Sequence, residues 1–210
     1  MEEFIMKKTN DIQNKNFIFI PDEIQYQFDS YIEKVIIPLL EAGEDTPIIE
    51  PQYWDLLIVL RYSGLRTQEV LHIIDESVSE DTECFQYDSP EYWNDRWHYS
   101  IPFMKTRMLY MNNKIQLPQM AQTNMISQAI IRQMKRVKTL PPTLNGCYYL
   151  FREMNSQSKI VPISSIKLNR ILKKISETIP LNTFDGAVYK LSPRQFRATA
   201  IKDMVKLHNI

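Results

Sequence analysis

Residues 62–71 read YSGLRTQEVL and mark a tight break between two helical patterns. Residues 53–61 before them (YWDLLIVLR) are apolar almost all round, which predicts a helix buried in the core. Gly64 can adopt a positive φ at little steric cost, so the chain can turn sharply there. We expect a second helix to open at Thr67, with Thr67 as its N-cap and Glu69 in its first turn, where the helix dipole favours a negative charge.

Arg66 stands between this turn and the second helix. A guanidinium held beside a rigid turn can aim its five donors at a phosphate. An exposed arginine at an ordinary helix corner would produce the same pattern. The segment alone therefore leaves both interpretations of Arg66 open.

Helical spacing of apolar residues dominates the rest of the chain. It predicts helices at about 21–41, 52–62, 120–137 and 164–175, and a last one that opens at Ser192-Pro193. Residues 97–103 and 108–117 read as the two strands of a hairpin. On the helix at 120–137 we expect a basic outer face of Arg132, Lys135, Arg136 and Lys138.

These elements predict an α+β, mostly helical fold, with a small antiparallel β-hairpin or three-stranded sheet at one edge. The 210 residues are enough for one domain. We expect residues 1–20 to be a linker and residues 21–210 to be the domain itself.

Composition excludes several classes of protein. Cys84 and Cys147 lie far apart, which argues against a zinc site or a disulfide framework and for a reducing, cytoplasmic compartment. The chain shows no signal peptide and no apolar run long enough to span a bilayer. Four glycines and the absence of a phosphate-loop pattern argue against a Gly-rich nucleotide site.

Charge is divided unevenly along the chain, although its net value is zero. Residues 1–100 hold 7 basic and 21 acidic side chains, a net charge of −14. Residues 101–210 hold 18 basic and 4 acidic side chains, a net charge of +14. Such a division indicates that one half of the chain faces a polyanion, or that the two halves complement each other inside one fold.

Two further basic elements accompany Arg66. Lys105 lies at the expected hairpin tip, and Arg194 and Arg197 lie in the first turns of the last helix, where their i, i+3 spacing puts them on one face. Cations gain nothing from the dipole at a helix N-terminus, so such a pair suggests an anion between them. A basic, solvated helix start is the plainer alternative.

The order of these elements resembles the catalytic domain of the tyrosine recombinases, the phage-integrase family, from about Ile20 to the end of the chain. The family's first Arg lies in a Gly-Leu-Arg-x-x-Glu segment, which residues 64–69 (GLRTQE) match. Its Lys often belongs to a Lys-Thr pair on a hairpin, as in Lys105-Thr106. Its His-x-x-Arg motif opens a helix, as residues 192–200 (SPRQFRATA) do here.

The chain departs from this family in two respects. Arg194 replaces the His, which keeps a hydrogen-bond donor but loses a group that titrates near neutral pH. None of the eleven tyrosines occupies the place of the nucleophile, which in the family lies downstream of the last motif. We therefore expect a catalytic domain truncated before its Tyr, and a fragment that is inactive and monomeric on its own.

The resemblance implies a mobile-element recombinase, integrase or transposase that acts on double-stranded DNA through a 3′-phosphotyrosine link, without metal or cofactor. Arg66 and Arg197 would clamp the phosphate oxygens, and Arg194 would donate a further hydrogen bond. Lys105 would protonate the leaving 5′-oxygen, and Glu69 would orient Arg66. Further DNA contacts are expected from Arg107, Lys114 and Lys190, and other protomers would join on the DNA.

Two other functions fit the same sequence. One is a non-catalytic DNA-binding domain of the same fold, which the missing Tyr and Arg194 favour. The other is an unrelated helical protein whose basic half binds another acidic partner. A metal-dependent nuclease is disfavoured because the four acids of the basic half are scattered: Glu153, Glu177, Asp185 and Asp203.

Overall fold

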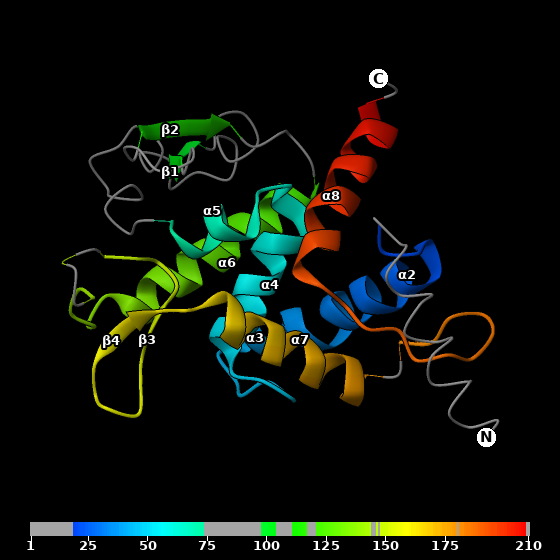
Figure 1. The fold of residues 1–210 in the computed structure, drawn as a ribbon, viewed down its shortest axis with the longest axis horizontal. Coiled ribbons are helices and arrows are strands. Elements are labelled where there is room, and N and C mark those ends of the chain that lie inside the picture. Colours follow the sequence, from blue (N-terminus) through cyan, green and yellow to red (C-terminus); the bar gives the residue numbers. More distant parts are fainter. Residues whose placement is uncertain are drawn as a thin grey trace. The chain divides into compact units, whose positions relative to one another are not determined.

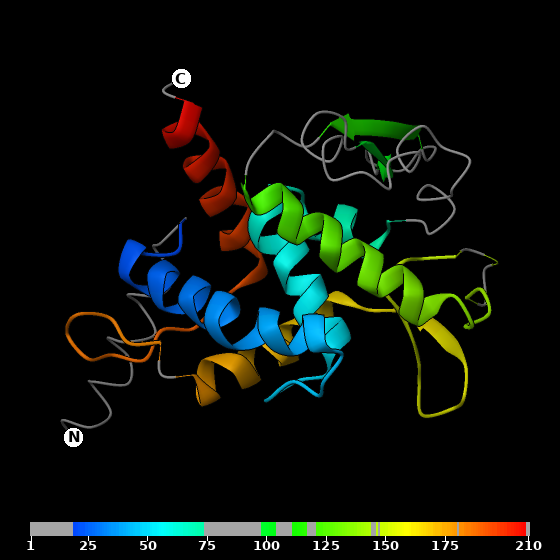
Figure 2. The ribbon, with the colours of Figure 1, turned by 180° about the vertical axis from the view of Figure 1, so that it is seen from behind.

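The computed structural model describes residues 19–73, 98–103, 111–116, 121–143, 146, 148–179 and 181–208. The chain divides into two compact units. The terminal unit combines Met1–Trp54 with Leu168–Ile210, and the central unit is Asp55–Lys167. Figure 1 traces both units along the chain, and Figure 2 shows the same ribbon from behind.

The central unit contains helices and two small antiparallel sheets. Its helices are α4 (Pro51–Ser63), most of which belongs to this unit, α5 (Thr67–Leu71) and α6 (Ala121–Val137). Strands β1 (His98–Phe103) and β2 (Met111–Gln116) pair with each other, and Ser100 lies opposite Lys114. Strands β3 (Arg152–Met154) and β4 (Ile160–Pro162) form the second sheet.

The core of the central unit is built on α4, whose residues from Asp55 to Ser63 are all buried. Leu150 ties the neighbouring segments together, because its N–H donates to the carbonyl of Ile73 at 2.7 Å and its carbonyl accepts from Gln133 Nε2 at 3.1 Å. These bonds satisfy the backbone of a buried segment that belongs to no sheet.

Arg152 closes the C-terminal end of α6. Its Nη2 donates to the carbonyls of Val137 at 2.8 Å and Leu140 at 3.0 Å, and its Nη1 donates to the carbonyl of Tyr149 at 2.7 Å. The side chain is buried, and a cation at this helix end complements the dipole. The buried guanidinium therefore stabilises the C-terminal end of α6 through its hydrogen bonds to backbone carbonyls.

The terminal unit contains α2 (Asp22–Tyr31), the π-helix η1 (Ile32–Ile36), α3 (Ile37–Ala42), most of α7 (Ser165–Thr178) and α8 (Pro193–His208). The rings of Phe28 and Phe196 pack 5.7 Å apart between α2 and α8. Thr199 Oγ1 accepts from the N–H of Ile20 at 2.9 Å. These contacts join the two ends of the described chain in one core.

The structure confirms a mostly helical α+β fold with small antiparallel sheets, and it confirms the hairpin of β1 and β2. Two predictions were wrong. The N-cap of α5 is Arg66, and Thr67 is the first helical residue. Arg132 and Arg136 do not form a solvated outer face, because both bind the buried Asp55.

The sheet of β3 and β4 was not predicted. Its strands have three residues each, too short for an alternating pattern to show in the sequence. Within the described ranges, no helix is both long and apolar enough to cross a bilayer.

Candidate functional site

Arg66 is held at the start of α5 by a single carboxylate. Its backbone N–H donates to Glu69 Oε2 at 2.6 Å, and its Nη1 donates to Glu69 Oε1 at 2.8 Å. The Glu69 side chain is 11% exposed, whereas the Arg66 side chain is 55% exposed. The carboxylate therefore fixes both the backbone and the guanidinium while leaving much of the arginine accessible from outside.

The chain folds into this corner for local reasons. Gly64 has a φ of 69°, the left-handed conformation that glycine adopts without strain. Ser63 Oγ accepts from the N–H of Leu65 at 3.2 Å, and Leu65 itself is buried. Since Val70 on α5 is also buried, apolar packing on both sides of Arg66 holds its backbone in place.

The hairpin residues predicted for the site are only partly described. Lys114 lies in β2 opposite Ser100, and β1 contacts α5, the helix that Arg66 caps. Lys105 and Arg107, predicted for the hairpin tip, lie outside the described residues. Their roles stay predictions.

Hydrogen bonds of the buried Gln195 side chain hold the start of α8 in place. Its Oε1 accepts from the N–H of Ser192 at 3.0 Å, and its Nε2 donates to the hydroxyl of Tyr189. Ser176 Oγ on α7 accepts from the N–H of Leu191 at 3.1 Å. Burial raises the pKa of Tyr189 to about 12, so its hydroxyl is neutral at physiological pH. The first turn of α8 is therefore fixed by buried hydrogen bonds.

Arg194 and Arg197 lie in the first turns of α8 and differ in exposure. Arg194 is exposed, and Lys190, just before the helix, is exposed as well. Arg197 is half-buried, and its Nε is a buried donor with no hydrogen-bond acceptor among the described residues. A buried donor without an acceptor costs about 1–3 kcal/mol.

The structure thus brings Arg194 and Arg197 together in the terminal unit, whereas Arg66 and Lys114 belong to the central unit. The starts of α5 and α8 share one local arrangement. In each case a side chain three residues after the N-cap, Glu69 or Gln195, accepts from the N-cap N–H.

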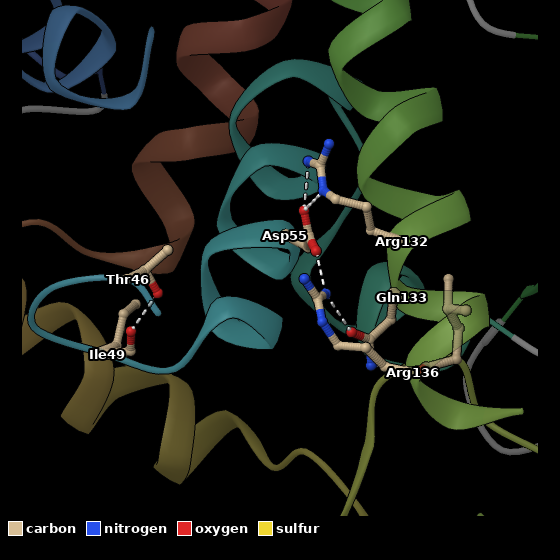
Figure 3. A network of polar contacts seen from close by, with 7 residues as sticks. Thr46, Ile49, Asp55, Arg132, Gln133 and Arg136 are labelled. Atoms are coloured by element: carbon tan, nitrogen blue, oxygen red, sulfur yellow. Dashed lines mark hydrogen bonds and ion pairs between the residues drawn. The ribbon is translucent and has the colours of Figure 1, made fainter. Parts of the chain in front are cut away.

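The most extensive charged network is one that the sequence did not predict (Figure 3). Asp55 Oδ1 accepts from Arg132 Nε at 3.0 Å and Nη2 at 2.6 Å, and its Oδ2 accepts from Arg136 Nη1. Arg136 Nη1 also donates to Gln133 Oε1 at 3.2 Å. Burial raises the pKa of the Asp55 carboxyl, and the two guanidiniums oppose that shift.

Two features of the sequence could have predicted this network. Asp55 is the one acid in the apolar segment 53–61, and a buried carboxylate needs a cation. Arg132 and Arg136 are four residues apart and so share one helix face.

No protein-family model matches this chain, and no curated protein or solved structure matches it with statistical significance.

Proposed function

We propose that this chain is part of the catalytic domain of a tyrosine recombinase, an enzyme that cuts and rejoins double-stranded DNA. Arg66, Arg194 and Arg197 would bind the scissile phosphate. The proposed fold is that of the DNA breaking and rejoining enzymes. The mostly helical architecture and the β1–β2 hairpin of this chain support it at a coarse level.

The observation that carries the proposal is the half-buried Arg197, whose buried Nε has no acceptor among the described residues. It lies at the start of a 16-residue helix, where the dipole and the first N–H groups favour an anion. Arg194 is exposed on the same first turns. Arg66 adds a second guanidinium whose orientation Glu69 fixes.

The proposed reaction needs no energy source besides the DNA bond itself. In this reaction a tyrosine oxygen would attack phosphorus, and the bond from phosphorus to the 5′-oxygen would break. Arg66 and Arg197 would stabilise the negative charge that builds on the non-bridging oxygens. Lys105 would give its proton to the departing 5′-oxygen.

DNA binding by this chain tests the phosphate site. We expect the affinity for a fluorescent duplex to fall as salt rises, with a logarithmic slope of about −0.9 for each phosphate contact. Arg66→Ala and Arg197→Ala should each weaken binding and make that slope shallower by about one contact. Lys159→Ala removes an equal charge from the β3–β4 loop and is the matched control. A duplex affinity that does not change with salt concentration would refute the proposal. So would a loss of affinity for Lys159→Ala as large as the loss for Arg197→Ala.

A non-catalytic DNA-binding domain of the same fold is the second candidate. Arg194 favours it, because a guanidinium at the place of the family's His stays charged and cannot exchange protons near neutral pH. A nicked suicide duplex, incubated with the protein, separates the two functions. A covalent adduct supports the recombinase, whereas tight binding without any adduct supports the binding domain.

A further inference from the structure

A short hairpin before α8 holds Phe184 in solvent. The Thr183 N–H donates to the carbonyl of Ala187 at 3.0 Å, and the Gly186 N–H donates to the carbonyl of Thr183 at 2.8 Å. Gly186 has a φ of 80°, which closes the turn. Phe184 at the tip is 93% exposed. Since these bonds fix the turn, the ring is presented outward by a defined backbone.

This hairpin is attached to α2. Gln27 Nε2 donates to the carbonyl of Asn182 at 2.8 Å, and Gln27 Oε1 accepts from the N–H of Asn182 at 3.0 Å. Asn182 pairs with Val188 across the hairpin, and Val188 is 56% exposed. Figures 1 and 2 both show the loop between α7 and α8 beside α2. Tyr26, the neighbour of Gln27 on α2, is 71% exposed.

The N-terminal part of the terminal unit, to which α2 belongs, is rich in acidic residues. Residues 19–54 contain eight acidic side chains and a single basic one, Lys34. Asp29 follows Tyr26 by three residues, and Glu33, in η1, follows Tyr26 by seven, so the three residues lie on one side of the helical segment. On the hairpin, a hydrogen bond from Thr183 lowers the pKa of Asp185, which keeps that carboxylate charged. The carboxylates of this helical segment and of the hairpin tip therefore favour a cationic partner.

We define the acidic aromatic patch as Tyr26, Glu33, Phe184 and Val188, all in the terminal unit. We propose that this patch binds an arginine- or lysine-rich segment of a partner protein. Arginine can stack on an aromatic ring and pair with a carboxylate, so one segment can use both components of the patch. The inference does not depend on the DNA site, which uses the opposite charge.

The probe for this proposal is a fluorescent peptide of alternating Arg and Gly, titrated into the full chain. We expect saturable binding, weakened about tenfold by Phe184→Ser and by Tyr26→Ser, because exposed aromatic anchors dominate such contacts. Glu33→Gln should weaken binding less, and the loss should shrink at high salt. Met154→Ser and Glu44→Gln are the controls, because each removes a comparable exposed group outside the patch.

Two results would overturn the proposal. One is no binding, or binding that the patch variants and the controls weaken equally, which would mean that acids elsewhere hold the peptide. The other is a chain that ignores the peptide but self-associates through Phe184 and Tyr26, which would make a second copy the occupant. Duplex binding by Phe184→Ser should match that of the unaltered chain, so this proposal and the proposed function can fail separately.

Discussion

Replacing Asp55 by Asn should destabilise the central unit strongly. The Asp55 side chain has no exposed surface, and Arg132 and Arg136 both donate to it. Asn keeps the shape but not the charge, so two guanidiniums lose their counter-ion. Removing one member of a buried ion pair typically costs 3–5 kcal/mol. We expect about 3 kcal/mol here, because Arg136 is 32% exposed and can turn toward water.

Urea denaturation of the whole chain measures this loss, with the midpoint and the slope fitted together. Arg132→Ala and Arg136→Ala should each cost less than Asp55→Asn, because one guanidinium remains to neutralise the carboxylate. Asp45→Asn removes an exposed carboxylate and should change the free energy of unfolding by no more than about 0.5 kcal/mol. A loss below about 1 kcal/mol for Asp55→Asn would refute the view that the network is structural.

Arg152→Lys should lower stability by about 2–3 kcal/mol in the same assay, because an ammonium cannot span the three carbonyls that the guanidinium joins. Glu69→Ala should cost about 1–2 kcal/mol, and Arg66→Ala less, because only the first change removes the acceptor for the N-cap N–H. For Tyr189, the raised pKa of about 12, against an ordinary 10.0, means that its contribution is complete below pH 10 and is lost as pH rises through 12. That loss is on the order of 3 kcal/mol, and Tyr189→Phe should remove it, as stability curves measured across alkaline pH would show.

Much of the helical architecture could be predicted because apolar spacing follows burial closely. The pattern from Ile24 to Leu40 predicted one helix, and the structure has three consecutive helical elements there, with the π-helix η1 between α2 and α3. No residue type marks that change, because a π turn differs from an α turn only in its hydrogen-bond register. Pro21 and Ser192-Pro193 predicted the starts of α2 and α8 correctly.

The errors have a common physical origin. Arg132 and Arg136 were assigned to solvent because charged residues usually lie there, but a buried carboxylate on another helix binds both of them. Thr67 was preferred as an N-cap by residue type. The cap instead falls on Arg66, because Glu69 reaches back to its N–H from three residues ahead. In the first case a carboxylate on another helix decides the outcome, and in the second a side chain three residues ahead does.

The site was predicted as separate motifs, and the structure adds their local geometry. Glu69 was expected to orient Arg66 and does contact its guanidinium. Nothing in the residue pattern around Arg197 predicted that Gln195 and Tyr189 would fix the start of α8, because that contact depends on how the preceding loop folds back.

The central proposal, which the family resemblance implies, is that Arg66 and Arg197 bind one phosphate. A crystal structure of the chain bound to a short duplex, with the separation of the two guanidinium carbons as the measured quantity, tests it most directly. Because each guanidinium donates to phosphate oxygens at about 2.8 Å, we predict a separation below about 9 Å, with one phosphate between them. Two guanidiniums too far apart to reach the same phosphate would contradict the claim.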